Sequence, residues 1–191
     1  MRRLSLFISL LLAPTLALAH PGHLETGLAA GFAHPFSGLD HLLAMLTVGL
    51  WAGYLGGAAR WQLPLTFVGV MLLGAGLGMA GFAVPWLETG IAASVLVLGL
   101  LLTLAAPLTA IARVSLVAVF ALLHGIAHGA ELPSTANAVG YLMAFATATA
   151  LLHGLGLTFA TGLATALPTR HSAIRWMGAA ISVAGGALLL G

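Results

Sequence analysis

The feature that most constrains this chain is a series of apolar stretches, each long enough to cross a membrane. About 20 apolar residues in a helix cover the ~30 Å of hydrocarbon in a bilayer. Six such stretches follow one another with short breaks, at 37–57, 63–83, 86–106, 111–130, 138–166 and 173–190. The breaks carry glycine, proline or arginine, as is usual between helices. The sequence therefore predicts an all-α membrane protein, a compact bundle of about six transmembrane helices.

The composition also indicates a lipid environment, which makes the bilayer an expected partner. Of 191 residues, 61% are hydrophobic and only 5% are charged, too few polar side chains to cover a water-soluble globule. Pairs of glycines four residues apart favour close contact between helices. These pairs are Gly49 and Gly53, Gly74 and Gly78, and Gly125 and Gly129.

The first nineteen residues have the layout of a cleavable signal peptide. Arg2 and Arg3 form a positive start, an apolar run follows at 4–12, and Ala17 to Ala19 supplies small residues for cleavage. We therefore expect a signal peptide at 1–19 and a single helix-bundle domain at 20–191. Without Arg2 and Arg3, four arginines balance four carboxylates, so the charge of the mature chain gives no indication of a nucleic-acid partner.

The arginines predict how the bundle is oriented. If the mature N-terminus is outside, the loops after the first, third and fifth spans face the cytoplasm. Those loops contain all four remaining arginines, Arg60, Arg113, Arg170 and Arg175, and the outward loops contain no lysine or arginine. Positively charged residues are retained on the cytoplasmic side of membranes. We therefore expect a multi-pass protein of the bacterial inner membrane, with both ends of the mature chain in the periplasm.

Side chains that can bind metal occur in two clusters within this apolar chain. The stretch "HPFSGLDHLLAM", near the start of the first span, contains His34, Asp40 and His41. The stretch "LLHGIAHGAELP", at the end of the fourth span, contains His124, His128 and Glu131. Because the first span runs inward and the fourth runs outward, both clusters lie roughly one to two helical turns below the same outer surface. We expect them to meet and form a site for a borderline divalent transition metal.

The spacing of the second cluster suits chelation by one helix face. Residues four apart have Cβ atoms ~5–6 Å apart, so His124 and His128 can hold one ion. Asp40 supports the same interpretation, because a carboxylate inside a span costs ~3 kcal/mol and usually has a partner and a function. Other interpretations stay open for single residues. Glu131 is also typical of a solvated helix end, and any one histidine could hydrogen-bond to a neighbouring helix.

Three further histidines have candidate roles. His153 lies near the middle of the fifth span, deeper than the two clusters, and is either a structural hydrogen-bonding residue or the next position on a pathway. Cleavage after Ala19 would give His20 a free α-amine, which can chelate a metal together with its imidazole, and His23 is nearby. We hypothesise a weak outer capture site there, with a solvated tail as the alternative.

The order of these motifs resembles the HupE/UreJ family over the whole mature chain. The resemblance is carried by "HPGH", "HPFSGLDHLLAMLTVGLWA", "HGIAHGAE" and "LLHGLG". It implies a membrane protein associated with nickel supply to hydrogenase and urease, which acts as a secondary permease for nickel, with cobalt suggested for some members. It also implies that the six residues of the two clusters handle the metal. The chain departs from the family pattern at Leu123, where an aromatic residue is common, and this change concerns packing rather than ligation.

The sequence allows secondary or channel-like transport. The chain has no lysine, so it lacks the glycine-rich, lysine-containing loop that binds nucleotide phosphates. It has no cysteine either, which excludes disulfides and thiolate ligands. Because histidine must be neutral to bind a metal, uptake is expected to weaken as the pH falls through the histidine range. We expect no permanent cofactor, only transported Ni²⁺ or Co²⁺ at the site.

Two other classes of function also use histidines in a membrane. An intramembrane zinc hydrolase would hold zinc with three histidines and an aspartate, with Ser37 close to the site and an open position for water. A bis-histidine haem protein needs one histidine on each side of the macrocycle, whereas these histidines are concentrated at one end. Ligand chemistry alone does not choose the ion, because intrinsic affinity favours copper over nickel. The sequence gives no indication of the oligomeric state.

Overall fold

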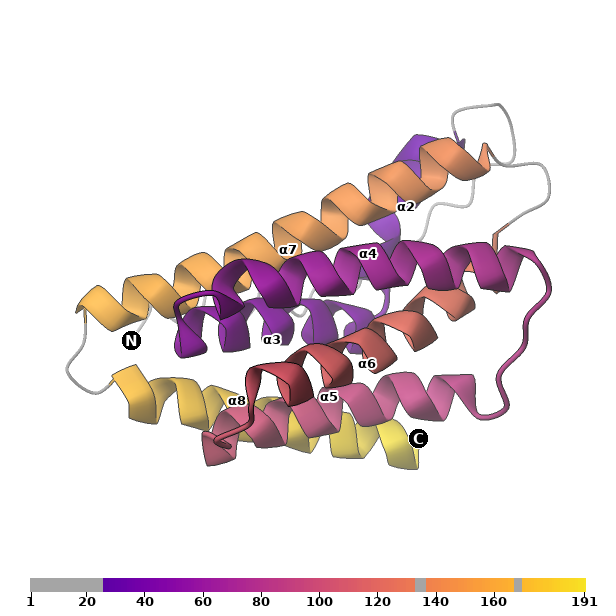
Figure 1. The fold of residues 1–191 in the computed structure, drawn as a ribbon. Coiled ribbons are helices and arrows are strands. Elements are labelled where there is room, and N and C mark those ends of the chain that lie inside the picture. Colours follow the sequence, from indigo (N-terminus) through magenta and orange to yellow (C-terminus); the bar gives the residue numbers. More distant parts are fainter. Residues whose placement is uncertain (1–25, 133–136, 167–169) are drawn as a thin grey trace, which may run out of the picture.

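A computed structural model of the protein describes residues 26–132, 137–166 and 170–191. These residues form helices and no strand, which confirms the all-α prediction. The helices are α2 (Thr26–Ser37), α3 (Leu39–Leu55), α4 (Ala59–Met79), α5 (Leu87–Leu104), α6 (Ala110–Ala130), α7 (Ala138–Ala166) and α8 (Arg170–Leu190). The long helices lie side by side along one direction (Figure 1). The predicted signal peptide at 1–19, together with His20 and His23, lies outside the described residues.

Helices α4 to α8 are each long and apolar enough to cross a membrane. Helices α2 and α3 meet at an angle of 81°, and this bent pair makes a sixth span when it is taken as one unit. The six predicted stretches correspond to α3 through α8, so the prediction of about six transmembrane helices is confirmed. The protein is therefore a multi-pass membrane protein.

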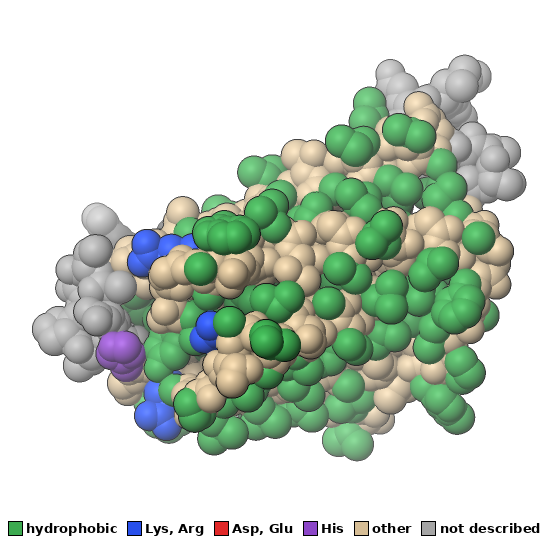
Figure 2. All heavy atoms as spheres, in the orientation of Figure 1, with side chains coloured by type: hydrophobic (Ala, Val, Ile, Leu, Met, Phe, Trp, Pro, Cys, Tyr) green, Lys and Arg blue, Asp and Glu red, His purple; other side chains and the backbone are tan. Residues whose placement is uncertain are grey.

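The surface of the bundle is apolar along its length. Figure 2 shows hydrophobic side chains over most of the visible face, with the arginines gathered at one end. Large apolar side chains such as Leu73, Ile111 and Val183 are mostly exposed. Monomeric water-soluble proteins rarely expose apolar patches of this extent, whereas a surface in contact with lipid tails requires them.

Glycines bring the long helices together in close pairs. Helix α4 packs along α6, α3 along α7, and α5 along α8. A Cβ on Gly78 would collide with the backbone of Ile126, and one on Gly129 would collide with the backbone of Ala75. Gly49 of α3 lies equally close to the backbone of α7. Close contact through small residues is a common way for helices to associate in a membrane, and the contacts predicted from the glycine pairs are confirmed.

Two prolines lie inside helices in the structure, and glycines mark the breaks next to them. The break after α3 is a turn at Gly56 and Gly57, with φ angles of 72° and 53°, and α4 already begins at Ala59. Pro64, at the start of the predicted stretch 63–83, lies inside α4. Similarly, Pro35 lies in the last turn of α2, and the chain bends later, at Gly38. Positive φ angles are far easier for glycine than for other residues, so the glycines and not the prolines set the turn after α3.

Helix α2 is absent from the sequence-based prediction. It has 12 residues and is therefore about 18 Å long, too short to be recognised as a span by apolar length. It packs against α7, where Gly31 lies against the backbone of Tyr141. This contact fixes the direction from which the chain enters α3.

The described arginines mark one end of the bundle. Arg60, Arg113 and Arg175 lie in the first two turns of α4, α6 and α8, and these helices begin at the same end (Figures 1 and 2). Glu131 lies at the opposite end, where α6 stops. The positive-inside rule predicts that the arginine end faces the cytoplasm.

A reporter fused after Gly191 tests this orientation. We expect it to be extracytoplasmic, because α8 starts at the arginine end and returns the chain to the side of its mature N-terminus. Paired fusions to alkaline phosphatase, which is active in the periplasm, and to a cytoplasm-active reporter give the measurement. A matched fusion in the turn at Gly56 and Gly57 should report the cytoplasm. A cytoplasmic signal after Gly191 would remove one span from the topology.

Candidate metal centre

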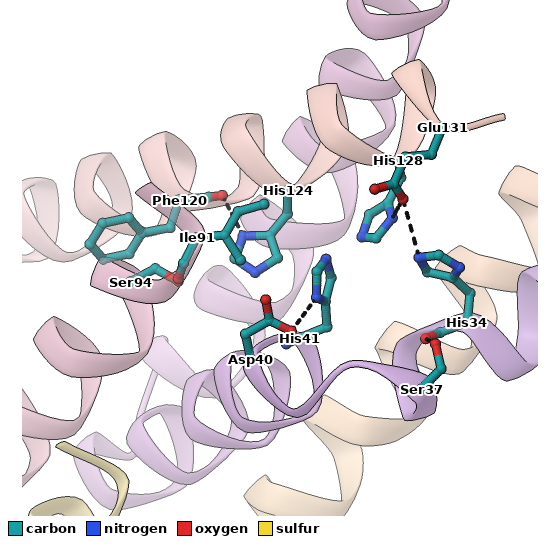
Figure 3. A network of polar contacts seen from close by, with 10 residues as sticks. All are labelled: His34, Ser37, Asp40, His41, Ile91, Ser94, Phe120, His124, His128 and Glu131. Carbon is teal, nitrogen blue, oxygen red and sulfur yellow. Dashed lines mark hydrogen bonds and ion pairs between the residues drawn. The ribbon is translucent and has the colours of Figure 1, made fainter. Parts of the chain in front are cut away.

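The two predicted clusters meet between the α2–α3 bend and the C-terminal end of α6 (Figure 3). The six side chains come from the last turn of α2, the first turn of α3, and the last turns and C-cap of α6: His34, Asp40, His41, His124, His128 and Glu131. Gly38 separates α2 from α3 in an extended conformation, and the bend brings the rings of His34 and His41 to 6.1 Å between centroids.

The four histidine rings form a continuous cluster. The centroid of the His128 ring lies 4.6 Å from that of His34 and 4.5 Å from that of His41. The His41 ring lies 5.1 Å from the ring of His124. Phe145 of α7 covers His128 at 4.2 Å. His124 and His128 are almost completely buried, so most of this cluster lies inside the bundle.

Glu131 lies close to two of these histidines, His34 and His128. Its Oε2 atom lies 3.7 Å from Nε2 of His34 and 3.9 Å from Nδ1 of His128. The ligand atoms of these three residues all lie within 4.8 Å of one another. Donors on one ion, bound at ~2.0–2.1 Å, are roughly 3 Å apart, so side-chain shifts of about 1–2 Å would bring the three donors onto a shared ion.

Asp40 orients His41. Its Oδ1 atom accepts hydrogen bonds from Nδ1 of the His41 ring at 2.7 Å and from the His41 backbone N–H at 2.8 Å. An ionised carboxylate only accepts, so Nδ1 carries the proton and Nε2 of His41 keeps a lone pair. Such a carboxylate fixes the ring and makes the free nitrogen a better metal ligand. Asp40, which the sequence predicts as a ligand, therefore contacts the cluster through His41 in this structure.

The backbone orients His124 in a similar way. Nδ1 of His124 lies 2.8 Å from the carbonyl oxygen of Phe120, one turn earlier on α6. Because a carbonyl only accepts, Nδ1 donates and Nε2 of His124 carries the lone pair. His41 and His124 are thus held in the same tautomer by two different acceptors, with Nε2 free in each ring.

Several nitrogens of the cluster are buried without hydrogen-bond partners among the described residues. They are Nε2 of His41, Nε2 of His124 and both ring nitrogens of His128. A buried polar atom left unpaired costs ~1–3 kcal/mol, so these nitrogens need a further partner. A divalent ion that accepts one lone pair from each of these three rings would supply that partner, and the second nitrogen of His128, which carries the N–H of the neutral ring, would donate to another acceptor. The imidazole and carboxylate donors suit a borderline ion such as nickel, cobalt or zinc.

Of the remaining predicted residues, His153 and His171 lie apart from this cluster, and Ser37 lies beside it. The ring of His153 contacts Phe67 and is deeper in the bundle. Ser37, which the hydrolase alternative requires, donates its hydroxyl to the His34 carbonyl at 2.7 Å. His171 contacts Tyr54 near the arginine end. The sequence missed the aromatic residues around the cluster, because phenylalanine and tyrosine in an apolar chain give no signal of their position.

Comparisons with known proteins agree with the motifs. The profile of the family described as "HupE / UreJ protein" matches residues 8–188. The chain belongs to the HupE/UreJ family. A relative, Protein HupE of Rhizobium leguminosarum bv. viciae, is 44% identical over 186 residues, which cover 96% of this chain and 95% of that protein. No solved structure matches the chain. The HupE/UreJ membership inferred from the motifs is confirmed over nearly the whole chain.

Substitution by glutamine tests the cluster as a binding site. Glutamine keeps a polar side chain of similar reach but lacks the imidazole lone pair. We expect His124→Gln and His128→Gln to lower the affinity of the purified protein for Ni²⁺ by about 10-fold or more, and Asp40→Asn to lower it by about 10–100-fold through the loss of His41 orientation. Equilibrium Ni²⁺ titration in detergent gives the measurement.

His171→Gln is the matched control, since this histidine lies outside the cluster and should bind Ni²⁺ like the parent. All variants should reach the membrane at near-normal levels. If the His124 and His128 variants both bind like the parent, the two histidines are structural and the metal-site interpretation is wrong.

Proposed function

We propose that the protein is a secondary permease for a divalent transition metal, with nickel as the first candidate cargo and cobalt as the second. The observation that carries this proposal is the convergence, inside an apolar helix bundle, of buried histidine nitrogens that have no hydrogen-bond partner among the described residues. Burying imidazole nitrogens without partners in hydrocarbon is unfavourable unless they bind a ligand. Ionisable residues within membrane spans commonly mark ion pathways.

The exposure of the cluster supports uptake from the outer side. The Glu131 side chain is 57% exposed and that of His34 is 29% exposed, whereas His124 is fully buried. An ion arriving from outside would meet Glu131 and His34 first, then His128 and His41, and then His124. At each position imidazole or carboxylate replaces part of the hydration shell, which lowers the cost of moving the ion away from water.

The donor set supports a borderline ion. Hard ions such as Mg²⁺ prefer oxygen donors alone, and soft Cu(I) prefers thiolate or thioether sulfur. The cluster offers nitrogen and oxygen, and the chain has no cysteine. Nickel takes first place because the HupE/UreJ family is associated with nickel supply to hydrogenase and urease, and cobalt follows because it is suggested for some members.

The driving force in this proposal is an ion gradient. The chain has no lysine and hence no nucleotide-binding loop of the Walker type, so transport depends on the gradient of the metal or of a coupled ion. The protein would lie in the bacterial inner membrane with its mature ends in the periplasm, an orientation supported by the arginine end of the bundle.

Metal uptake by sealed proteoliposomes tests the proposed function. Vesicles containing a metal-sensitive dye are challenged in turn with Ni²⁺, Co²⁺, Cu²⁺ and Zn²⁺. We expect Ni²⁺ or Co²⁺ to enter at least ~10-fold faster than in protein-free vesicles, and His128→Gln to abolish most of this difference because it removes the central ring of the cluster. His171→Gln should transport like the parent.

The same preparation separates the permease from the hydrolase alternative. A zinc hydrolase would release products from the vesicle lipids or from an added membrane peptide without metal entering the lumen. Uptake that is equal in parent, His128→Gln and protein-free vesicles would contradict the permease.

A further inference from the structure

A further buried histidine lies deeper in the bundle than the site formed by His34, Asp40, His41, His124, His128 and Glu131, which is called the outer cluster below. His153 of α7 is 1% exposed, and neither of its ring nitrogens has a hydrogen-bond partner among the described residues. Helix α7 passes the cluster at Phe145, whose ring contacts His128. His153 lies eight residues further along α7, which places it ~12 Å deeper at ~1.5 Å per residue. Burying an imidazole unpaired at this depth is unfavourable, so the position requires an explanation of its own.

The Phe67 side chain contacts both His153 and the innermost histidine of the cluster. Its ring centroid lies 5.4 Å from that of His124 and 5.0 Å from that of His153. Phe67 comes from α4, which packs against both α6 and α7, and it is fully buried. An aromatic ring offers no lone pair to a transition metal, so it interrupts the series of imidazoles at this point.

A crevice between α4 and α7 extends from His153 toward the arginine end of the bundle. It has a volume of about 240 Å³ and is lined by residues of α4 and α7, among them Arg60, Pro64, His153 and Leu157. Arg60 lies in the first turn of α4, at the arginine end. Residues near His153 thus line an open space on the side away from the outer cluster.

We propose that His153 is a second, inner binding position for the transported ion, and that Phe67 is the partition between this position and the outer cluster. This inference rests on the proposed permease function. With Phe67 in its present place, an ion at His124 reaches His153 only after the phenyl ring is displaced. From His153 the ion leaves along the crevice beside Arg60. The outer cluster determines binding, and His153 determines the rate of passage.

A comparison of binding with uptake tests the inner position. We expect His153→Gln to bind Ni²⁺ from solution with an affinity within about 2-fold of the parent, because the outer cluster is intact. We expect its uptake rate at saturating Ni²⁺ to fall about 10-fold or more. His171→Gln should match the parent in both measurements.

The outcomes separate the two proposals. If the parent itself takes up no metal, both the permease and the inner position are overturned. If the parent transports and His153→Gln transports equally well, only the inner position is overturned. Loss of Ni²⁺ binding in His153→Gln would mean that His153 supports the outer cluster structurally, which also overturns it.

Thiol labelling tests the partition without relying on transport. The chain has no cysteine, so His153→Cys introduces a single thiol. In right-side-out and inverted membrane vesicles, we expect a charged, membrane-impermeant methanethiosulfonate to label this thiol about 10-fold faster from the cytoplasmic face. Adding Phe67→Ala should raise labelling from the outer face about 10-fold. Adding Phe159→Ala, which removes a half-exposed ring elsewhere on α7, should change nothing. Equal labelling from both faces with Phe67 present would overturn the partition.

Discussion

A buried imidazole nitrogen without a hydrogen-bond partner destabilises a protein. Several such nitrogens lie together at the centre of this helix bundle. Each such atom costs ~1–3 kcal/mol, and the lipid phase supplies no water to compensate. Hydrogen bonds to Asp40 and to the Phe120 carbonyl satisfy one nitrogen each in His41 and His124, while the other nitrogen stays free. Close backbone packing at glycines such as Gly78 and Gly129 stabilises the helix bundle and offsets the unfavourable free energy of the unpaired nitrogens. Side chains that lower the stability of a protein are typically found at its functional sites.

Most of the histidines, and Phe67 between them, lie on two close-packed helix pairs, whereas His34 lies on α2, which packs against α7. His41 and His153 belong to the α3–α7 pair, whereas Phe67, His124 and His128 belong to the α4–α6 pair. Within each pair, glycine contacts at the backbone fix the helices relative to each other. Between the pairs, the ring of His41 contacts those of His124 and His128, and the ring of Phe67 contacts that of His153. A small rearrangement of one pair against the other would therefore change the geometry of the cluster and the position of Phe67 while leaving each pair intact.

The sequence was sufficient to predict the spans and the meeting of the two histidine clusters. Apolar length determines whether a helix can cross a bilayer, and the predicted fifth span coincides with α7. The opposite directions of the first and fourth spans place His41 and His128 at the same depth, and their rings lie 4.5 Å apart. These inferences need only helix geometry, the direction of each span and the four-residue spacing of His124 and His128.

Features that depend on contacts between distant segments could not be predicted. Helix α2 is too short to stand out by hydropathy, and its direction is set by packing on α7. The bond from His41 to Asp40 depends on side-chain conformations at the start of α3. The position of Phe67 between two histidines depends on how α4 packs against α6 and α7. Phe67 looks like any other apolar residue of its helix until the tertiary structure is known.

X-ray absorption spectroscopy of the purified, nickel-loaded protein measures most directly whether the histidine cluster binds the ion. We predict a shell of nitrogen and oxygen donors without sulfur, with the multiple-scattering pattern of several imidazole rings. This imidazole pattern should be lost when His124→Gln and His128→Gln are combined. A spectrum of fully hydrated nickel in the parent protein, with no imidazole contribution, would contradict a metal site built from these histidines.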